Sequence, residues 1–232
     1  MWRLAAILFF TLHFAACGFN NYNSSVYPYQ FNADLVNKPI KTVMILPINF
    51  YTPSRHYLQK HEALVDDSVQ KYLKKSDYVI LSNRSFTSLW QHSLINYGNV
   101  FNPSTGELTS AFKPALKHTL EQLFKQHPSL DAVIFTDLIE QQLQYSNASK
   151  KSAQWNGVIR KVKIEGVGED VTEEFDWKKV VDGISISIHV LNREQALVQH
   201  SLGGIQIAQS IKLNNKKAKF GRRHDLLAKE KE

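Results

Sequence analysis

The fold is decided by residues 42–48, which read TVMILPI, an apolar run of strand length with a proline near its end. Such runs are typical of strands buried on both faces, as in the centre of a parallel sheet. Further along the chain, residues 77–82 (DYVILS) and 130–136 (LDAVIFT) predict two more buried strands. Residues 42–48 therefore indicate an α/β fold.

Helical patterns separate these strands. Residues 56–75 repeat apolar side chains at three- and four-residue steps, which predicts an amphipathic helix. Asn83 is a suitable cap for a second helix that carries Phe86, Leu89, Trp90 and Leu94. After the turn signal NPSTG (102–106), a third helix is predicted over residues 111–126. Strand, helix, strand, two helices and strand predict a parallel βαβα(α)β half with helices on the sheet faces.

The second half alternates apolar and polar residues, which favours antiparallel strands covered on one side. Residues 183–190 (GISISIHV) predict one strand, and Arg193-Glu194 a turn into a strand over 196–210 with a bulge at Gly203-Gly204. Residues 152–165 predict another strand and residues 166–170 a mobile loop. The fold expected is α/β with a mixed sheet, parallel in the first half and antiparallel in the second.

The amino-terminus has the layout of a secretory signal, with one early positive charge and an apolar run over residues 4–14. The run is shorter than the roughly 20 residues that span a bilayer. Residues 1–16 are expected to be a signal peptide and 17–39 a flexible tether. Residues 40–211 are expected to form a single domain and 212–232 a basic tail with eight Lys and Arg against three acids. The tail is expected to be a solvated, partly disordered end or a patch for anionic polymers or lipid head groups.

Cys17 is the only cysteine and follows the apolar run directly, after Ala15-Ala16. This segment resembles a bacterial lipoprotein signal, in which the cysteine is lipidated and becomes the new amino-terminus. The alternative is an ordinary cleaved signal with a cysteine there by chance. Gly18 follows the cysteine in place of Asp, which by resemblance to proteobacterial sorting implies the periplasmic face of the outer membrane.

The composition and the motifs argue against several classes of protein. One cysteine in 232 residues excludes a disulfide framework, and the scattered histidines favour no metal site. The net charge of +7 would suggest nucleic acid, but the amino-terminal signal argues against that partner. No phosphate-binding glycine loop, serine elbow or metalloprotease motif occurs. We therefore expect no cofactor, no metal and no nucleic acid.

A candidate ligand edge lies where the parallel strands are predicted to end. Asp137 and Glu140 are candidates for a carboxylate pair in acid/base work, the alternative being solvated residues at a strand exit. Asp66-Asp67 are expected on the exposed side of the first helix. The edge as a whole comprises Asn49, Tyr51, Arg55, Ser82, Asn83, Thr136, Asp137 and Glu140.

The combination of Cys17, the Asn/Tyr-rich tether, strand 43–47, helix 56–75, strand 77–82 and the late alternating strands resembles a group of small α/β domains of envelope lipoproteins. The group includes outer-membrane activators of peptidoglycan synthases, the periplasmic part of the curli secretion channel and the amino-terminal domain of the Tol–Pal β-propeller protein. The turn at 102–106, followed by Asp131-Ala132-Val133, is similar to uncharacterised proteobacterial lipoproteins. No amphipathic pore-forming insertion is present, which disfavours a secretion pore.

The resemblance implies a non-catalytic outer-membrane lipoprotein, held to the membrane through lipid on Cys17, whose periplasmic domain binds or assists an envelope protein assembly. The absence of a catalytic motif agrees with this expectation. The alternative is a periplasmic hydrolase or ligand-binding enzyme that acts on cell-wall or lipid material at the predicted edge.

Overall fold

The computed structural model describes residues 26–48, 56–147, 152–168, 180–215, 217–223 and 226. The first half contains β1 (Tyr29–Phe31), a 3-10 helix η1 (Ala33–Leu35), β2 (Thr42–Leu46), α1 (His56–Lys75), β3 (Val79–Ile80), α2 (Arg84–Tyr97) and α3 (Phe112–Gln126). The second contains β4 (Ala132–Leu143), β5 (Tyr145–Asn147), β6 (Ser152–Trp155), β7 (Val158–Lys161), β8 (Lys163–Gly168), β9 (Val181–Asn192), β10 (Leu197–Ile207), β11 (Gln209–Asn215) and β12 (Lys217–Arg222). The prediction of a mixed α/β fold is confirmed.

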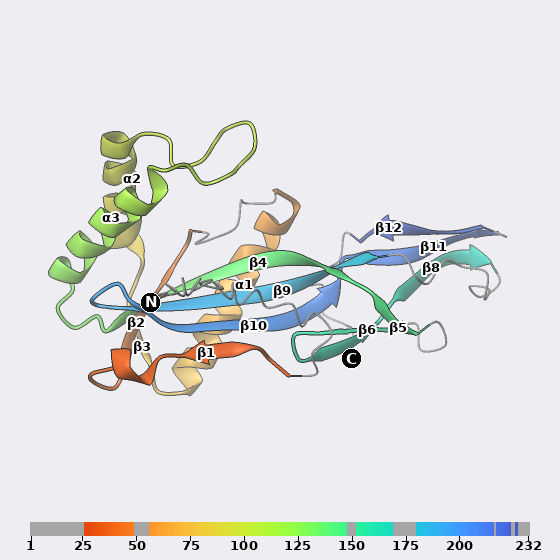
Figure 1. Ribbon diagram of the computed structural model, residues 1–232, viewed down its shortest axis with the longest axis horizontal. Helices are drawn as coiled ribbons and strands as arrows, with labels where there is room; N and C mark the ends of the chain where they lie inside the picture. Colours follow the sequence, from red (N-terminus) through yellow and green to blue (C-terminus); the bar gives the residue numbers. More distant parts are fainter. Residues whose placement is uncertain are drawn as a thin grey trace, which may run out of the picture.

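The main sheet has six strands in the order β1-β10-β9-β4-β2-β3 (Figure 1). Strands β3 and β4 flank β2 and are parallel to it, whereas β9, β10 and β1 pair antiparallel. Strand β4 pairs with β9 over its whole length, from Ala132 opposite Asn192 to Leu143 opposite Val181. This long ladder is the centre of the molecule.

The two faces of the main sheet carry different helices. Met44, Leu46 and Phe135 point to one face, where they pack with α2 and α3. Val43, Ile45 and Ile134 point to the other, where they pack with Val69 and Leu73 of α1. We call these the α2–α3 face and the α1 face. They differ because neighbouring residues of a strand point to opposite sides. In the part of the chain that the structure describes, no helix has the length and apolar character to cross a membrane.

Aromatic side chains hold the pair of helices α2 and α3. The rings of Phe86 and Trp90 stack at 6.1 Å, and Phe112 meets Trp90 edge-on at 5.9 Å. Asn83 occupies the N-cap position of α2, but its side chain makes no cap hydrogen bond. Its amide instead donates to the carbonyl of Ile45 at 3.3 Å, because α2 begins beside the end of β2.

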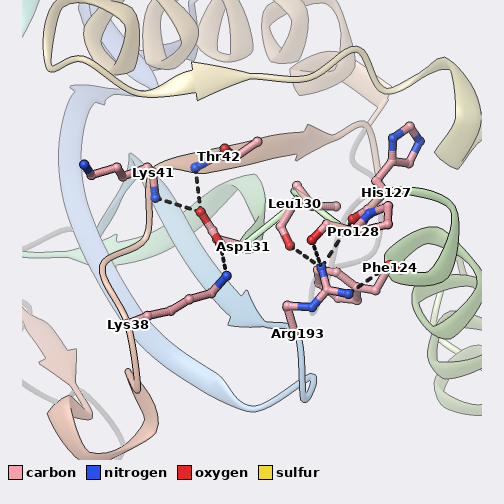
Figure 2. A network of polar contacts seen from close by, with 9 residues as sticks. All are labelled: Lys38, Lys41, Thr42, Phe124, His127, Pro128, Leu130, Asp131 and Arg193. Atoms are coloured by element: carbon pink, nitrogen blue, oxygen red, sulfur yellow. Dashed lines mark hydrogen bonds and ion pairs between the residues drawn. The ribbon is translucent and has the colours of Figure 1, made fainter.

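Asp131 ties the segment before β2 to the start of β4 (Figure 2). Its carboxylate accepts hydrogen bonds from the backbone N–H groups of Lys41 and Thr42 at 3.0 and 2.9 Å, and lies 2.7 Å from the Lys38 ammonium. Burial raises the pKa of this carboxyl, but the Lys38 and backbone contacts outweigh it, so the pKa lies below its usual value.

Arg193, in the turn after β9, connects that turn to the end of α3 and the loop before β4 (Figure 2). Its guanidinium donates to the carbonyls of Phe124, His127, Pro128 and Leu130 at 2.7–3.3 Å. It also lies 5.3 Å from the centre of the Phe124 ring. These carbonyls belong to the end of α3 and the loop to β4, so one cation of the β9–β10 turn satisfies the helix terminus.

Residues 152–165 form three strands and not the single strand expected. The pair Asn156-Gly157 turns the chain between β6 and β7 with φ of 39° and 81°. Asn-Gly is the preferred pair for such a two-residue turn because both positions need positive φ. Strands β5, β6 and β7 form one small sheet, and β8, β11 and β12 another, which we call the distal sheet.

Both segments expected to be flexible, the tether and the basic tail, contain β-strands. Residues 29–31 of the expected tether form β1 and pair with β10. Strand β11 runs across the boundary placed at residue 211, and β12 lies within the expected basic tail. The cause is an alternation masked by lysines, since Ile211, Leu213, Ala218 and Phe220 all pack into one apolar cluster. Of the two expectations for the tail, that of a solvated, partly disordered end is thus corrected for 212–215 and 217–222.

One residue, Ala208, separates β10 from β11. It is buried; its N–H donates to the Asp182 carbonyl at 2.7 Å, and its own carbonyl accepts from the Arg223 N–H at 2.9 Å. Beside it, the Gln209 amide donates to the Asp182 carboxylate at 2.6 Å and accepts from the Asp182 N–H at 2.7 Å. The main and distal sheets are joined by this network.

Candidate functional site

The structure brings few of the predicted edge residues together. Cys17, Asn49, Tyr51 and Arg55 lie outside the described residues. Ser82 is exposed just before α2, where its hydroxyl lies 3.5 Å from the Arg84 N–H. Asn83 is bonded to Ile45, as described above. The remaining three residues, Thr136, Asp137 and Glu140, lie inside β4.

Asp137 and Glu140 do not form a carboxylate pair. The sequence places the end of the strand at residue 136, but β4 continues to Leu143, so both residues are in mid-strand. Three positions apart on a strand, their side chains point to opposite faces of the sheet. Glu140 is on the α1 face, where it pairs with Arg222 of β12. Asp137 is on the α2–α3 face.

Thr136 is also on the α1 face, where its hydroxyl donates to the carboxylate of Asp66 from α1. Burial raises the pKa of Asp66, and the Thr136 hydrogen bond opposes that effect. Asp66 was expected on the exposed side of the helix, so its position is a correction. Asp67 is exposed as expected and pairs with Lys71 at 2.6 Å.

Around Asp137 lies a cluster of polar side chains that sequence reasoning missed. It consists of Asp137 from β4, Ser187 and His189 from β9, and His200 from β10, and we call it the polar cluster. Asp137 is opposite Ser187 in the register, and His189 is opposite His200. The two imidazole rings stack at 4.2 Å with an angle of 9° between them. Asp137, Ser187 and His189 are buried.

Burial sets the protonation of the two histidines. It lowers the pKa of His189 to about 3, with the neighbouring His200 acting in the same direction, and it lowers the pKa of His200 as well. His189 is therefore neutral at pH 7. The 3.9 Å contact between its Nδ1 and Asp137 Oδ2 is then a contact of a carboxyl group with a neutral ring and not an ion pair.

The polar cluster contains the residue types of a Ser-His-Asp triad in a different arrangement. Ser187 Oγ lies 3.2 Å from His200 Nε2, a distance suited to proton transfer. Asp137, however, contacts the other histidine, so the acid does not orient the imidazole beside the serine. Ser187 is only 4% exposed, which leaves a substrate little access to the hydroxyl. The arrangement is that of a buried polar network between three strands.

The polar cluster continues into a second group at the β6–β7 hairpin. The indole N–H of Trp155 and the amide of Asn156 donate to Ser185 Oγ at 3.0 and 3.1 Å, and Ser185 Oγ donates to Gln141 Oε1 at 2.9 Å. These contacts pin the hairpin to the sheet. Among the described residues, no group of three or more His, Cys, Asp and Glu side chains is placed to hold a metal ion.

An apolar groove with a volume of about 680 Å³ lies on the α1 face. Its floor includes Ile134 of β4 and Ile188 and Val190 of β9, beside Val69 and Leu73 of α1. We call it the α1 groove. Its lining is completed by Phe31, Val36, Ile40, Val43, Ser68, Val69, Tyr72, Leu73, Ser76, Tyr78 and Gln199.

Three aromatic residues line the α1 groove, Phe31, Tyr72 and Tyr78, and two of them are exposed. Tyr72 on α1 is 69% exposed and Phe31 on β1 is 53% exposed. Phe31 and Val36 lie in the stretch expected to be a tether, which is why the sequence did not reveal the groove. The available signal was apolar residues recurring in that stretch, at Val26, Phe31, Leu35 and Val36.

No protein-family model, curated protein or solved structure matches this chain.

Proposed function

We propose that this protein is a non-catalytic lipoprotein, anchored through lipid on Cys17 at the periplasmic face of the outer membrane, whose domain binds a protein of an envelope assembly. The observation that carries the proposal is the α1 groove. The amino-terminal signal and the resemblance to small α/β envelope lipoproteins support the proposed location.

The α1 groove has the properties of a site for an apolar protein segment. Its volume lies within the roughly 300–1,000 Å³ of ligand sites, and its floor is aliphatic. Tyr72 and Phe31 are large, exposed aromatic side chains of the kind that dominates binding energy at protein interfaces. Gln199 adds an amide that can bond to the backbone of a bound segment, whereas the hydroxyls of Ser68 and Ser76 donate to carbonyls of the helix and can only accept. We propose an amphipathic segment of a partner as the occupant.

The experiment combines a crosslinker with a variant that fills the groove. A photoreactive phenylalanine analogue replaces Tyr72 in the full chain in cells, and replaces Ile95, which is 81% exposed on α2, as the control. Ser68 is exposed, lines the α1 groove and is replaced by Trp in a second chain. Ser88, an exposed serine of α2, is replaced by Trp as the matched control.

We expect a protein adduct of defined mass from position 72 and none from position 95. The adduct should be lost with Ser68→Trp and retained with Ser88→Trp. An adduct that forms equally at both positions, or that persists when Ser68→Trp fills the groove, contradicts the proposal. So does an adduct that contains lipid and no protein.

A hydrolytic or ligand-binding activity is the second candidate, and the 3.2 Å contact of Ser187 with His200 is the observation that favours it. Its test is complementation of a deletion strain. If Ser187→Ala and Asp137→Asn restore every envelope phenotype as fully as the parent chain, the polar cluster has no catalytic role.

A further inference from the structure

The distal sheet has two faces of opposite character. Ile211, Leu213, Ala218 and Phe220 point to one face and pack into an apolar cluster with Tyr145. The register places Lys163 and Glu165 of β8, Ser210 and Lys212 of β11, and Lys219 and Gly221 of β12 on the other face. We call this second surface the lysine face. The distal sheet lies at the end of the molecule opposite α2 and α3 (Figure 1).

Glu165, the one acid that the described strands place on the lysine face, is already engaged. Glu165 accepts a hydrogen bond from Ser210 Oγ at 3.0 Å and pairs with Lys163 at 3.0 Å. Among the ion pairs of the described residues, none involves Lys212 or Lys219, although the register places Glu165 opposite Lys212. Among the described residues, the lysine face therefore has Lys163, Lys212 and Lys219 against the single acid Glu165, and two of these lysines are side by side on β11 and β12.

Lys212 and Lys219 stand directly opposite each other in the antiparallel register. Like charges at such positions repel and destabilise a strand pair. The backbone nevertheless accommodates the arrangement, since a Cβ added at Gly221 would lie 2.6 Å from Lys212 Cε and 2.8 Å from its Cδ. Glycine at 221 thus leaves room for the Lys212 stem to lie across β12, on the side where Lys219 points.

We propose that the lysine face binds the surface of an anionic phospholipid bilayer, with Lys212 and Lys219 as the contacting cations. Two adjacent lysines on a sheet surface whose described residues carry a net positive charge complement a plane of negative head groups. The same surface is poorly suited to nucleic acid, because single strands are bound through aromatic rings on which bases stack. The aromatic residues here, Tyr145 and Phe220, stack on each other at 6.0 Å against the opposite face.

This inference does not depend on the α1 groove. A partner at the groove engages the main sheet, whereas the lysine face belongs to the distal sheet. Contact of the lysine face with lipid would add an electrostatic attachment to the acyl anchor proposed at Cys17. Each basic residue near an anionic surface contributes roughly a five-fold gain in binding at moderate salt, so two account for about 30-fold.

The test measures sedimentation of the full chain carrying Cys17→Ser, in which no acyl chain contributes, with vesicles of phosphatidylcholine alone or mixed with phosphatidylglycerol. The variant is Lys212→Glu/Lys219→Glu. The control is Lys113→Glu/Lys117→Glu, the same charge change at two exposed lysines of α3 at the other end of the molecule. Circular dichroism establishes that each variant is folded.

We expect binding to anionic vesicles to exceed binding to neutral ones, and to fall steeply between 50 and 500 mM salt as charges are screened. The Lys212/Lys219 variant should lose about 30-fold or more of the anionic component, and the α3 control at most a few-fold. Equal losses in the two variants, or no loss in the first, overturn the proposal. It is also overturned if a single-stranded oligonucleotide binds through the same lysines more tightly than the vesicles at the same salt. A variant that fails to fold is replaced by Lys212→Gln/Lys219→Gln, for which loss of the anionic component is again required.

Discussion

Arg193 donates hydrogen bonds to four carbonyl oxygens of residues 124–130, and its guanidinium also lies over the Phe124 ring. We predict that Arg193→Ala lowers the free energy of unfolding by about 3 kcal/mol, because the carbonyls lose a charged donor at the end of α3. Arg193→Lys should recover only part of this loss, since an ammonium cannot reach four acceptors. Urea unfolding measures the effect. Arg84→Ala, at an exposed position of α2, is the control and should change stability by less than about 0.5 kcal/mol.

His189 makes stability depend on pH. Its pKa is about 3 in the folded protein and near 6.5 in the unfolded chain, so the unfolded chain binds more protons below pH 6.5. Its contribution is complete above pH 6.5 and is lost as the pH falls toward 3. We predict that His189 alone removes about 1 kcal/mol of stability between pH 7.5 and 5.5. Denaturant titrations of the parent and of His189→Gln at both pH values measure it. An equal loss in both proteins would assign the effect to other groups.

At the scale of elements, the pair of helices α2 and α3 depends on Trp90, which contacts both Phe86 and Phe112. Trp90→Ala should lower the free energy of unfolding by about 3 to 5 kcal/mol, the usual cost of removing a buried aromatic ring. Ile95→Ala on the same helix removes a side chain that is 81% exposed and should cost less than about 0.5 kcal/mol. Thermal and urea unfolding compare the two. Similar losses would mean that Trp90 contributes no packing.

The helices could be predicted closely from the sequence because their periodicity is long. Helix α1 has the bounds that the pattern of residues 56–75 predicts, and α3 begins within one residue of the prediction. Each has at least four turns of recurring apolar residues, and Pro128 marks where the third helix has ended.

Strand ends could not be predicted in the same way. Strand β4 continues seven residues past Thr136 because β9 supplies a pairing partner all the way to Leu143, whose partner Val181 is 38 residues further along the sequence. The error carried into the candidate site, since it placed Asp137 and Glu140 at an edge when they lie on opposite faces. Pairing between distant strands, and not local composition, sets such boundaries.

Strands β11 and β12 and the polar cluster were also not predicted from the sequence. Lysines between the apolar residues of β11 and β12 gave the end of the chain the composition of a solvated tail, although the alternation of Ile211, Leu213, Ala218 and Phe220 was present. The polar cluster was partly visible, since Ser187 and His189 share a face of one predicted strand. The other two members, Asp137 and His200, could not be predicted, because only the register of three strands places them beside Ser187 and His189.

At the scale of the whole molecule, the lipid anchor proposed on Cys17 would determine where the protein is found. We predict that the native protein begins at residue 17, carries additional acyl mass and fractionates with the outer membrane. Cys17→Ser should lack that mass and leave the outer-membrane fraction. Intact mass spectrometry and membrane fractionation measure both properties. A chain that keeps residues 1–16, or an unmodified Cys17, contradicts the proposed anchor.

The main and distal sheets are connected by a single residue, Ala208, whose surroundings hold it firmly. Both backbone groups of Ala208 are bonded, its side chain is buried, and the Gln209–Asp182 contacts brace the same point. A rotation of one sheet against the other would have to break several of these bonds together. We therefore expect the two sheets to move as one rigid unit. A contact that fixes the orientation of the distal sheet would then also fix the direction in which the α1 groove faces.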